Sequence, residues 1–198
     1  ALRVLNDDTI AAGMGFGTHP HDNMEIITIP LEGDLAHKDS MGNAATIKTG
    51  DVQVMSAGSG IRHSEFNPNA DQQTKLFQIW LFPNKENVTP RYQQITLDQS
   101  LQKNNFAQIL SPNPEDEGVW IHQDAWFYLS DFEQDVTKQL ALKKEGNGFY
   151  IMTIEGEIEV NGEKLNTRDA IGIWNTNTLE IKAVTAAKFL VMEIPMEH

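Results

Sequence analysis

The sequence contains no cysteine. Disulfide bonds and thiol catalysis are therefore excluded, and any redox chemistry must come from a bound group or from methionine. A chain without cysteine suits a reducing compartment, so we expect a cytoplasmic protein.

Positive charge is scarce. The chain has 15 Lys and Arg residues against 28 Asp and Glu residues, which gives a formal net charge of −13. Nucleic acids and anionic membrane surfaces attract clustered positive charge, so we predict that the chain binds neither directly. No apolar run approaches the roughly 18 residues that a transmembrane helix requires.

Several functional motifs are also missing. The sequence has no P-loop, no Gly-x-Ser-x-Gly nucleophile elbow and no dinucleotide-binding glycine pattern followed by a helix. The chain begins at Ala1, without an initiator Met and without the pattern of a signal peptide. Since residues 1–5 look like a strand entered midway, we expect that residues upstream of Ala1 are missing.

Short apolar runs alternate with turns that contain Gly or Asn. This pattern is typical of sandwiches and barrels, so we predict an all-β fold. The run Leu76–Phe82 is apolar on both faces, which predicts a central buried strand. In the first half the predicted strands are Leu2–Leu5, His19–Glu32, Asp34–Asp39, Val52–Met55, Ile61–Phe66 and Lys75–Pro83.

The second half repeats the pattern of the first. Ile151–Gly156 resembles Ile27–Gly33, and Thr167–Ile173 resembles Thr49–Met55. Between the halves lie two loose stretches, 83–91 and 111–118, with a possible short helix within 97–110. We therefore predict two tandem β-barrel domains, residues 1–100 and 101–198.

Two pairs of ionisable residues carry the chemistry: His19 and His21, and His63 and Glu65. Alternate residues of a strand point to one face, so each pair projects both side chains to the same side. Because His63 and Glu65 share the parity of the apolar Ile61, they should face inward. Burying them would be costly unless they bind a ligand or a partner. The sequence therefore predicts a divalent metal ion held by three imidazoles and one carboxylate.

The donor set favours Fe(II), Mn, Ni, Cu or Zn over Ca or Mg. Open coordination positions beside histidine and carboxylate suit O2 chemistry at iron, so Fe(II) is the expected ion. Pro20 lacks a backbone donor, which predicts that the His pair lies at a sheet edge or a barrel mouth. His63 follows Asp51 by twelve residues, whereas Ile181 occupies that spacing after Asp169, so the second domain should bind no metal.

The remaining candidates have simpler interpretations. His37 lies beside a turn, and we expect a hydrogen-bonded or exposed residue rather than a fifth ligand. His122 is interpreted as a structural residue of the second half. The aromatic residues predicted to lie in the core are Phe77, Trp80, Phe82, Trp126, Phe127 and Tyr128.

These motifs together resemble the pirin family, in particular the bacterial pirin-like quercetin 2,3-dioxygenases. The blocks that carry the resemblance are Gly17–His21, Met24–Ile27, Leu31–Gly33, His37–Asn43 and Met55–Glu65, extended by Thr89–Tyr92 and Ile121–Asp124. The resemblance implies a bicupin with one metal in its N-terminal cupin, and the ligands of the family fall on His19, His21, His63 and Glu65. Glu25 occupies the region where many other cupins place a carboxylate ligand, but it is not a ligand position in pirin-like proteins. Asp22 departs from the family, in which many members carry a basic residue there.

The resemblance implies a flavonol 2,3-dioxygenase that uses a small phenolic substrate and O2. In that hypothesis the metal lowers the pKa of the substrate 3-hydroxyl, and Glu65 accepts its proton as general base. An alternative is a metal-dependent, redox-sensing regulatory protein that binds a protein partner. In a third hypothesis the metal only stabilises the fold.

Overall fold

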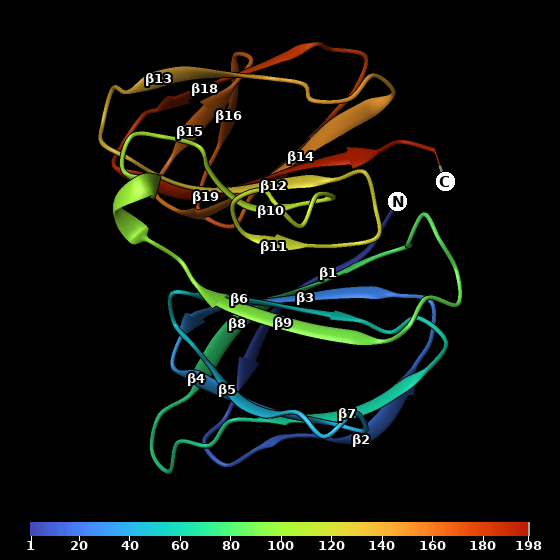
Figure 1. The fold of residues 1–198 in the computed structure, drawn as a ribbon. Helices are drawn as coiled ribbons and strands as arrows, with labels where there is room; N and C mark the ends of the chain where they lie inside the picture. The colour runs from blue at the N-terminus through green and yellow to red at the C-terminus, as the bar shows by residue number, and fades with distance from the viewer. Residues whose placement is uncertain (198) are drawn as a thin grey trace. The chain divides into compact units, whose positions relative to one another are not determined.

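The computed structural model describes residues 1–197, and strands and turns dominate it (Figure 1). The single helical element among these residues is the short 3-10 helix η1 (Gln99–Gln102), within the range where sequence predicts a short helix. The prediction of an all-β fold is confirmed. No helix in the described part of the chain has the length and apolarity to cross a membrane.

The chain forms two compact units, of which unit 1 comprises Ala1–Leu97 and Gly118–Gln123. Two sheets lie face to face in unit 1, with the strand orders β1-β8-β3-β6-β9 and β2-β7-β4-β5 (Figure 1). Its strands are β1 (Leu2–Ile10), β2 (Gly15–His21), β3 (Glu25–Glu32), β4 (Asp34–Asp39), β5 (Ala44–Lys48), β6 (Asp51–Ser56), β7 (Ile61–Phe66), β8 (Thr74–Leu81), β9 (Arg91–Thr96) and the short β11 (Val119–Trp120). As predicted, the run Leu76–Phe82 contributes a central strand, since β8 lies between β1 and β3.

Unit 2 comprises Asp98–Glu117 and the chain from Asp124 onward. Its strands pair in the orders β10-β12-β19-β14-β17 and β13-β18-β15-β16. They are β10 (Ala107–Ser111), β12 (Trp126–Phe132), β13 (Thr137–Ala141), β14 (Asn147–Glu155), β15 (Ile158–Val160), β16 (Glu163–Leu165), β17 (Ala170–Ile173), β18 (Thr178–Ala183) and β19 (Ala187–Pro195). The order β1-β8-β3-β6 of unit 1 thus recurs as β12-β19-β14-β17, and β2-β7-β4-β5 recurs as β13-β18-β15-β16.

The predicted repeat is also visible in its turns. The Thr49 hydroxyl donates a hydrogen bond of 3.0 Å to the carbonyl of Gly33, and the Thr167 hydroxyl donates one of 3.0 Å to the carbonyl of Gly156. Both glycines have positive φ angles, +74° and +80°, and backbone atoms lie within 3 Å of where a Cβ would be. Only glycine fits such a position without strain, so both Glu-Gly turns depend on the same residue type.

The predicted strand His19–Glu32 is wrong in one respect, because it is two strands. The strand breaks between β2 and β3 at Asn23, whose φ angle of 43° lies in the left-handed region. Asn adopts this conformation more readily than most residues do. The Asn23 amide donates to the carbonyl of Gly58 at 2.8 Å, and its side-chain oxygen accepts from the amide of Asn87 at 2.7 Å. Because of this break, β2 belongs to the sheet β2-β7-β4-β5 and β3 to the sheet β1-β8-β3-β6-β9. The ring of His21 on β2 contacts the ring of Trp80 on β8, in the opposite sheet.

A short return segment, Gly118–Gln123, packs on unit 1 after the chain has already entered unit 2. The guanidinium of Arg91 lies 3.8 Å from the ring centroid of Trp120 and donates a hydrogen bond of 2.5 Å to the Trp120 carbonyl. The amide of Asn84 donates to the carbonyl of His122 at 2.6 Å, and the Gln123 side chain donates to the carbonyl of Phe82 at 2.7 Å. Sequence interpretation assigns His122 to the second half, but these contacts place it in unit 1.

Each unit buries a core of apolar side chains. Of the aromatic residues predicted to be in the core, Phe77, Phe127 and Tyr128 are buried, whereas Trp80, Phe82 and Trp126 are only partly buried. One cluster in the core of unit 2 is built from Phe132, Phe149, Ile151, Ile158, Val160, Leu179, Ile181, Ala183, Phe189 and Val191 among others. In unit 1, one cluster of Met24, Ile26, Met55, Ala57 and Ile61 packs with Trp80 and Phe82.

Candidate metal centre

Strands β2 and β7 bring the two predicted pairs together. They are antiparallel neighbours in which His19 lies directly opposite His63 and His21 lies opposite Ile61, with an irregularity in register between Phe16 and His19. β2 is the edge strand of its sheet, as the presence of Pro20 predicts. His19 and His21 therefore lie on an edge strand, whereas His63 lies on β7, which has a neighbouring strand on both sides.

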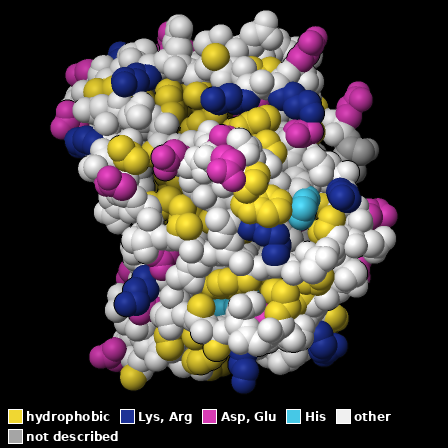
Figure 2. Space-filling model, viewed as in Figure 1, with side chains coloured by type: hydrophobic (Ala, Val, Ile, Leu, Met, Phe, Trp, Pro, Cys, Tyr) yellow, Lys and Arg dark blue, Asp and Glu magenta, His cyan; other side chains and the backbone are white. Residues whose placement is uncertain are grey.

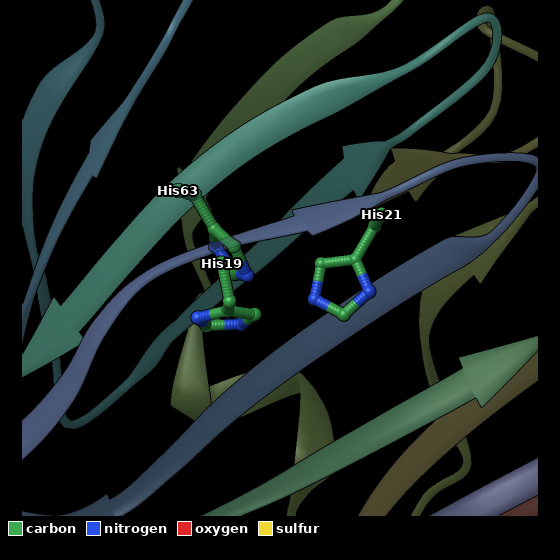
Figure 3. A group of neighbouring side chains, drawn as sticks. All are labelled: His19, His21 and His63. Atoms are coloured by element: carbon green, nitrogen blue, oxygen red, sulfur yellow. The ribbon is translucent and has the colours of Figure 1, made fainter.

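The three imidazoles converge. Their ring centroids are 4.4 Å apart for His19 and His63, 4.9 Å for His19 and His21, and 5.0 Å for His21 and His63. Each offers a ring nitrogen that lies within 4.8 Å of the others, and Figure 3 shows the rings gathered between the strands that carry them. His63 is buried, whereas His19 and His21 are partly exposed, so the group lies between the interior and the surface.

The hydrogen bonds of these rings leave nitrogen lone pairs without partners. Nδ1 of His19 lies 2.8 Å from the carbonyl of Gly17, which leaves Nε2 for another contact. Nε2 of His21 and both ring nitrogens of His63 are buried and make no hydrogen bond within the described chain. A buried polar atom without a partner costs about 1–3 kcal/mol, and a bound cation would remove that cost. The donors therefore fit a divalent metal ion.

Burial favours the neutral form of the His21 and His63 imidazoles. Burial, together with the neighbouring rings of His19 and His21, lowers the pKa of His63 to about 3. Burial, with His19 next, also lowers the pKa of His21. Since a metal binds the neutral form of imidazole, His21 and His63 are in the required state at neutral pH.

Glu65 lies beside this group but is not part of the closest triad. Its carboxylate oxygen groups with ring nitrogens of His63 and His37, again within 4.8 Å, and the three-histidine group does not include it. Of the four predicted ligands, the structure thus gathers His19, His21 and His63 tightly and brings Glu65 together with His63 alone.

A chain of hydrogen bonds across the two sheets orients Glu65. The side chain of Gln78 on β8 donates to Oε2 of Glu65 at 2.8 Å, and the Trp80 indole donates to Oε1 of Gln78 at 3.2 Å. Burial raises the pKa of Glu65, and the bond from Gln78 opposes this rise. Sequence analysis missed Gln78, although a single amide inside the apolar run Leu76–Phe82 was a signal that could have identified it.

The structure confirms the first of the two alternatives predicted for His37, a hydrogen-bonded or an exposed residue. It is hydrogen-bonded, as predicted, with Nε2 3.2 Å from Oδ2 of Asp39, but it is buried. Its ring centroid lies 5.3 Å from that of His63 and 4.9 Å from that of Tyr92. The i, i+2 spacing of His37 and Asp39 on one strand repeats the pattern of the other pairs and was the available signal.

Apolar side chains border the site. The ring of Trp80 stands edge-on to His21, with centroids 4.9 Å apart, and packs with the cluster that contains Met24, Ile26 and Met55. Figure 2 shows hydrophobic side chains around a recess in this face of unit 1, with a histidine side chain visible inside it. Such surroundings suit an ion that meets a flat apolar ligand.

Glu25, which sequence analysis excluded as a ligand, makes its hydrogen bond elsewhere. Its Oε2 accepts a hydrogen bond from the Ser56 hydroxyl at 2.7 Å. Glu25, Ser56 and Arg91 lie opposite one another on the neighbouring strands β3, β6 and β9. Burial raises the pKa of Glu25 to about 7, against the opposing effects of Ser56 and Arg91. The metal-binding groups of the described residues do not include it.

Known proteins resemble the chain along nearly its whole length. The Pirin family model matches residues 1–81, and a model described as the quercetinase C-terminal cupin domain matches residues 108–194. The chain is 42% identical to a quercetin 2,3-dioxygenase of Escherichia coli strain K12, over 98% of this chain and 83% of that protein. It is 38% identical to a pirin-like protein of Caulobacter vibrioides, over 98% and 83% of the two chains.

Solved structures agree with these matches. The crystal structure of YhhW from Escherichia coli superposes with a TM-score of 0.94 at 40% identity, covering 100% of this chain and 83% of that one. A nickel(II) complex of the bacterial pirin YhhW gives a TM-score of 0.92 at 38% identity, covering 98% and 82%. A pirin that binds a divalent metal, together with the histidine and glutamate donors described above, supports a metal ion in this protein as well. The chain is a bicupin and belongs to the pirin family.

Proposed function

We propose that the protein is a metal-dependent dioxygenase that cleaves flavonols such as quercetin with O2. The observation that carries the proposal is the convergence of three imidazoles, a nearby carboxylate and an apolar wall in unit 1. The name of the Escherichia coli relative, a quercetin 2,3-dioxygenase, supports the same substrate class. The metal-binding domain would be the N-terminal cupin predicted at residues 1–100, which in the structure also includes the return segment Gly118–Gln123.

His19, His21, His63 and Glu65 would hold the ion. When bound, the metal supplies Lewis acidity to an enolic hydroxyl and an open coordination position for O2 chemistry. We expect Fe(II) as the native ion, and metal analysis of protein purified without added metals tests that expectation.

The chain itself supplies a base, an orienting group and a dry wall. The Glu65 carboxylate would accept the proton of the substrate 3-hydroxyl, because it is the buried carboxylate beside the three imidazoles. The amide of Gln78 fixes the orientation of that carboxylate. Trp80 and the cluster beside it would pack against the flat rings of a flavonol and exclude water.

The test is incubation of iron-loaded protein with quercetin in air. We expect loss of the flavonol absorbance and release of carbon monoxide. Absence of turnover with iron, nickel, copper and manganese would instead favour the regulatory alternative.

Substitution of Glu65 separates its roles as base and as ligand. Glu65→Gln should abolish turnover more completely than it reduces metal content, since an amide still offers an oxygen donor but cannot take the proton. Equal loss of turnover and metal would remove the base role. Glu180→Gln on the exposed face of β18 is a matched control that should leave both unchanged.

A further inference from the structure

A row of polar side chains crosses the sheet that lies opposite the metal-binding strands. Thr28 on β3 lies directly opposite Gln78 on β8 and Gln53 on β6. The row continues to β9, where Gln94 lies opposite Gln53. Directly opposite residues of antiparallel strands project their side chains to the same face. Since the side chain of Gln78 donates to Glu65 in the other sheet, the row faces the interior of unit 1.

The neighbouring positions support this orientation. Residues two apart on a strand share a face, so Thr28 shares the face of Ile26, and Gln53 shares the face of Met55. Ile26 and Met55 belong to one buried cluster with Ile61 of β7, in the opposite sheet. Thr28 and Gln53 are therefore polar residues on an inward face that is otherwise apolar beside them.

The two residues in the middle of the row are buried without a polar partner. The exposed fractions of Thr28 and Gln53 are 0% and 1%. The hydroxyl oxygen of Thr28 and Nε2 of Gln53 make no hydrogen bond within the described chain. Gln94, in contrast, donates to the carbonyl of Thr46 and to Oδ2 of Asp51. Because buried polar groups are nearly always hydrogen-bonded, Thr28 and Gln53 suit a bound molecule that presents oxygen atoms to them.

The row also lies close to the proposed metal group. Cβ atoms of directly opposite residues are about 5 Å apart, so Thr28 is one strand spacing from Gln78. The amide of Gln78 contacts Glu65, and Gln53 lies one strand spacing beyond Thr28. A flat aromatic ligand that binds the metal through one oxygen can therefore reach this row with oxygens on its other rings.

We propose that Thr28 and Gln53 bind ring hydroxyl groups of the substrate and thereby determine its specificity. The inference rests on the proposed function and narrows its substrate class to flavonols with hydroxyl groups besides the 3-hydroxyl. Nε2 of Gln53 donates to a substrate oxygen, and the Thr28 hydroxyl donates to or accepts from one. Neither residue takes part in proton transfer, so both are specificity-determining residues.

The test compares quercetin with 3-hydroxyflavone, which retains the 3-hydroxyl and the 4-carbonyl but lacks the ring hydroxyls. Metal-loaded protein should favour quercetin by at least about 10-fold in kcat/KM, because the smaller compound leaves the two buried groups unpaired. Thr28→Val/Gln53→Met keeps the size of both side chains and removes their polar atoms. We expect this variant to reduce the preference to within about 3-fold, mainly through a higher KM for quercetin. The Kd of each compound without O2, from quenching of tryptophan fluorescence, should change in the same way.

Thermal stability separates this role from a structural one. Since neither polar atom has a partner within the described chain, replacing them with apolar groups should not lower the melting temperature. Thr153→Val is the matched control, because Thr153 is a buried threonine of unit 2 whose hydroxyl also lacks a partner in the described residues. It should leave the preference for quercetin unchanged.

Two results would overturn the inference: a parent protein that does not distinguish the two compounds, or a preference that persists in Thr28→Val/Gln53→Met. The second result would indicate that water, not substrate, pairs with these residues. If the parent protein neither binds nor cleaves either compound, the proposed function fails as well, so the two failures are distinguishable. Should the double variant not fold, Thr28→Val and Gln53→Met are made singly, and each must reduce the preference.

Discussion

Corresponding strands of the two units carry different buried side chains. β7 and β18 occupy corresponding places in the orders β2-β7-β4-β5 and β13-β18-β15-β16. Their buried alternate residues are Ile61, His63 and Glu65 in β7, and Leu179, Ile181 and Ala183 in β18. One scaffold thus accepts either a polar interior or an apolar one, and the side chains rather than the backbone decide whether a unit can bind metal.

The two interiors are stabilised in different ways. In unit 2, the apolar residues of β18 join a continuous core whose burial contributes about 25 cal/mol per Å2 of apolar surface. In unit 1, buried nitrogens such as those of His63 lack partners within the described chain, so bound metal should add stability to the folded state. Substitutions that exchange the two interiors test this comparison.

The largest effect on metal binding is expected when unit 1 is given the residue of unit 2. His63→Ile, which copies Ile181, should lower metal affinity by more than about 100-fold, because loss of even an outer-shell partner costs 10- to 100-fold. Metal content after dialysis is the measurement, with circular dichroism to confirm folding. Ile181→Val is the control, and metal loss there as well would show that the effect is not specific to the site.

The reverse exchange should destabilise the protein. Ile181→His places an imidazole in a fully apolar core without a partner, at an expected cost of about 3–5 kcal/mol. Chemical denaturation measures this cost, and Ile181→Leu should cost less than about 1.5 kcal/mol. A histidine that is tolerated at residue 181 would contradict the view that the core of unit 2 is tightly filled.

A pH effect distinguishes two buried carboxylates, one in each unit. Oε1 of Glu25 has no hydrogen-bond partner in the described residues, whereas Glu193 accepts from the amides of Lys143 and Lys144 and from the side chain of Asn147 at 2.9–3.0 Å. The pKa of Glu25 is raised by burial from 4.5 to about 7. The folded state therefore retains this proton over a range in which the unfolded state has lost it.

Stability should consequently fall as pH rises from about 4.5 to about 7, with a contribution on the order of 3 kcal/mol from Glu25. Glu25→Gln should flatten the dependence of the melting temperature on pH in this window. Glu193→Gln should instead destabilise at every pH in the window, since it converts an acceptor of several hydrogen bonds into a partial donor. An unaltered pH profile for Glu25→Gln would contradict the assignment.

The smallest predicted effect concerns two Gln–carboxylate pairs. Gln78 donates to the buried Glu65 at 2.8 Å in unit 1, and Gln139 donates to Glu180 at 2.9 Å on an exposed face of unit 2. Gln78→Leu should release Glu65 and lower metal affinity by about 10-fold. Gln139→Leu should leave metal affinity unchanged, and a similar loss in both variants would mean that orientation of Glu65 is not the cause.

Much of the fold follows from local sequence signals. The two Glu-Gly turns and the Asp-led strands predict the repeat, and the structure shows why these residues recur. Asp51 accepts a hydrogen bond of 2.9 Å from the amide of Lys48, and Asp169 accepts one of 2.9 Å from the amide of Asn166. These turns depend on hydrogen bonds between residues that are close in sequence, so the sequence pattern alone could predict them.

The parts of the site that depend on contacts across the sheets were not predictable. The period of two placed His19, His21, His63 and Glu65 on common faces, but it could not show that Gln78 from β8 would reach Glu65. Nor could it show that His37 from β4 would bury its ring beside His63. The first contact depends on the packing of two sheets, and the second depends on the pairing of β4 with β7.

The return segment Gly118–Gln123 has a consequence for how the protein is made. During synthesis, unit 1 cannot be completed when its last long strand, β9, leaves the ribosome. It must wait until residue 123 has emerged, because only then are Trp120 and His122 available to cover Arg91 and Asn84. A gene truncated after Leu97 would thus encode an unfinished domain, and the two cupins cannot be separated by a single cut.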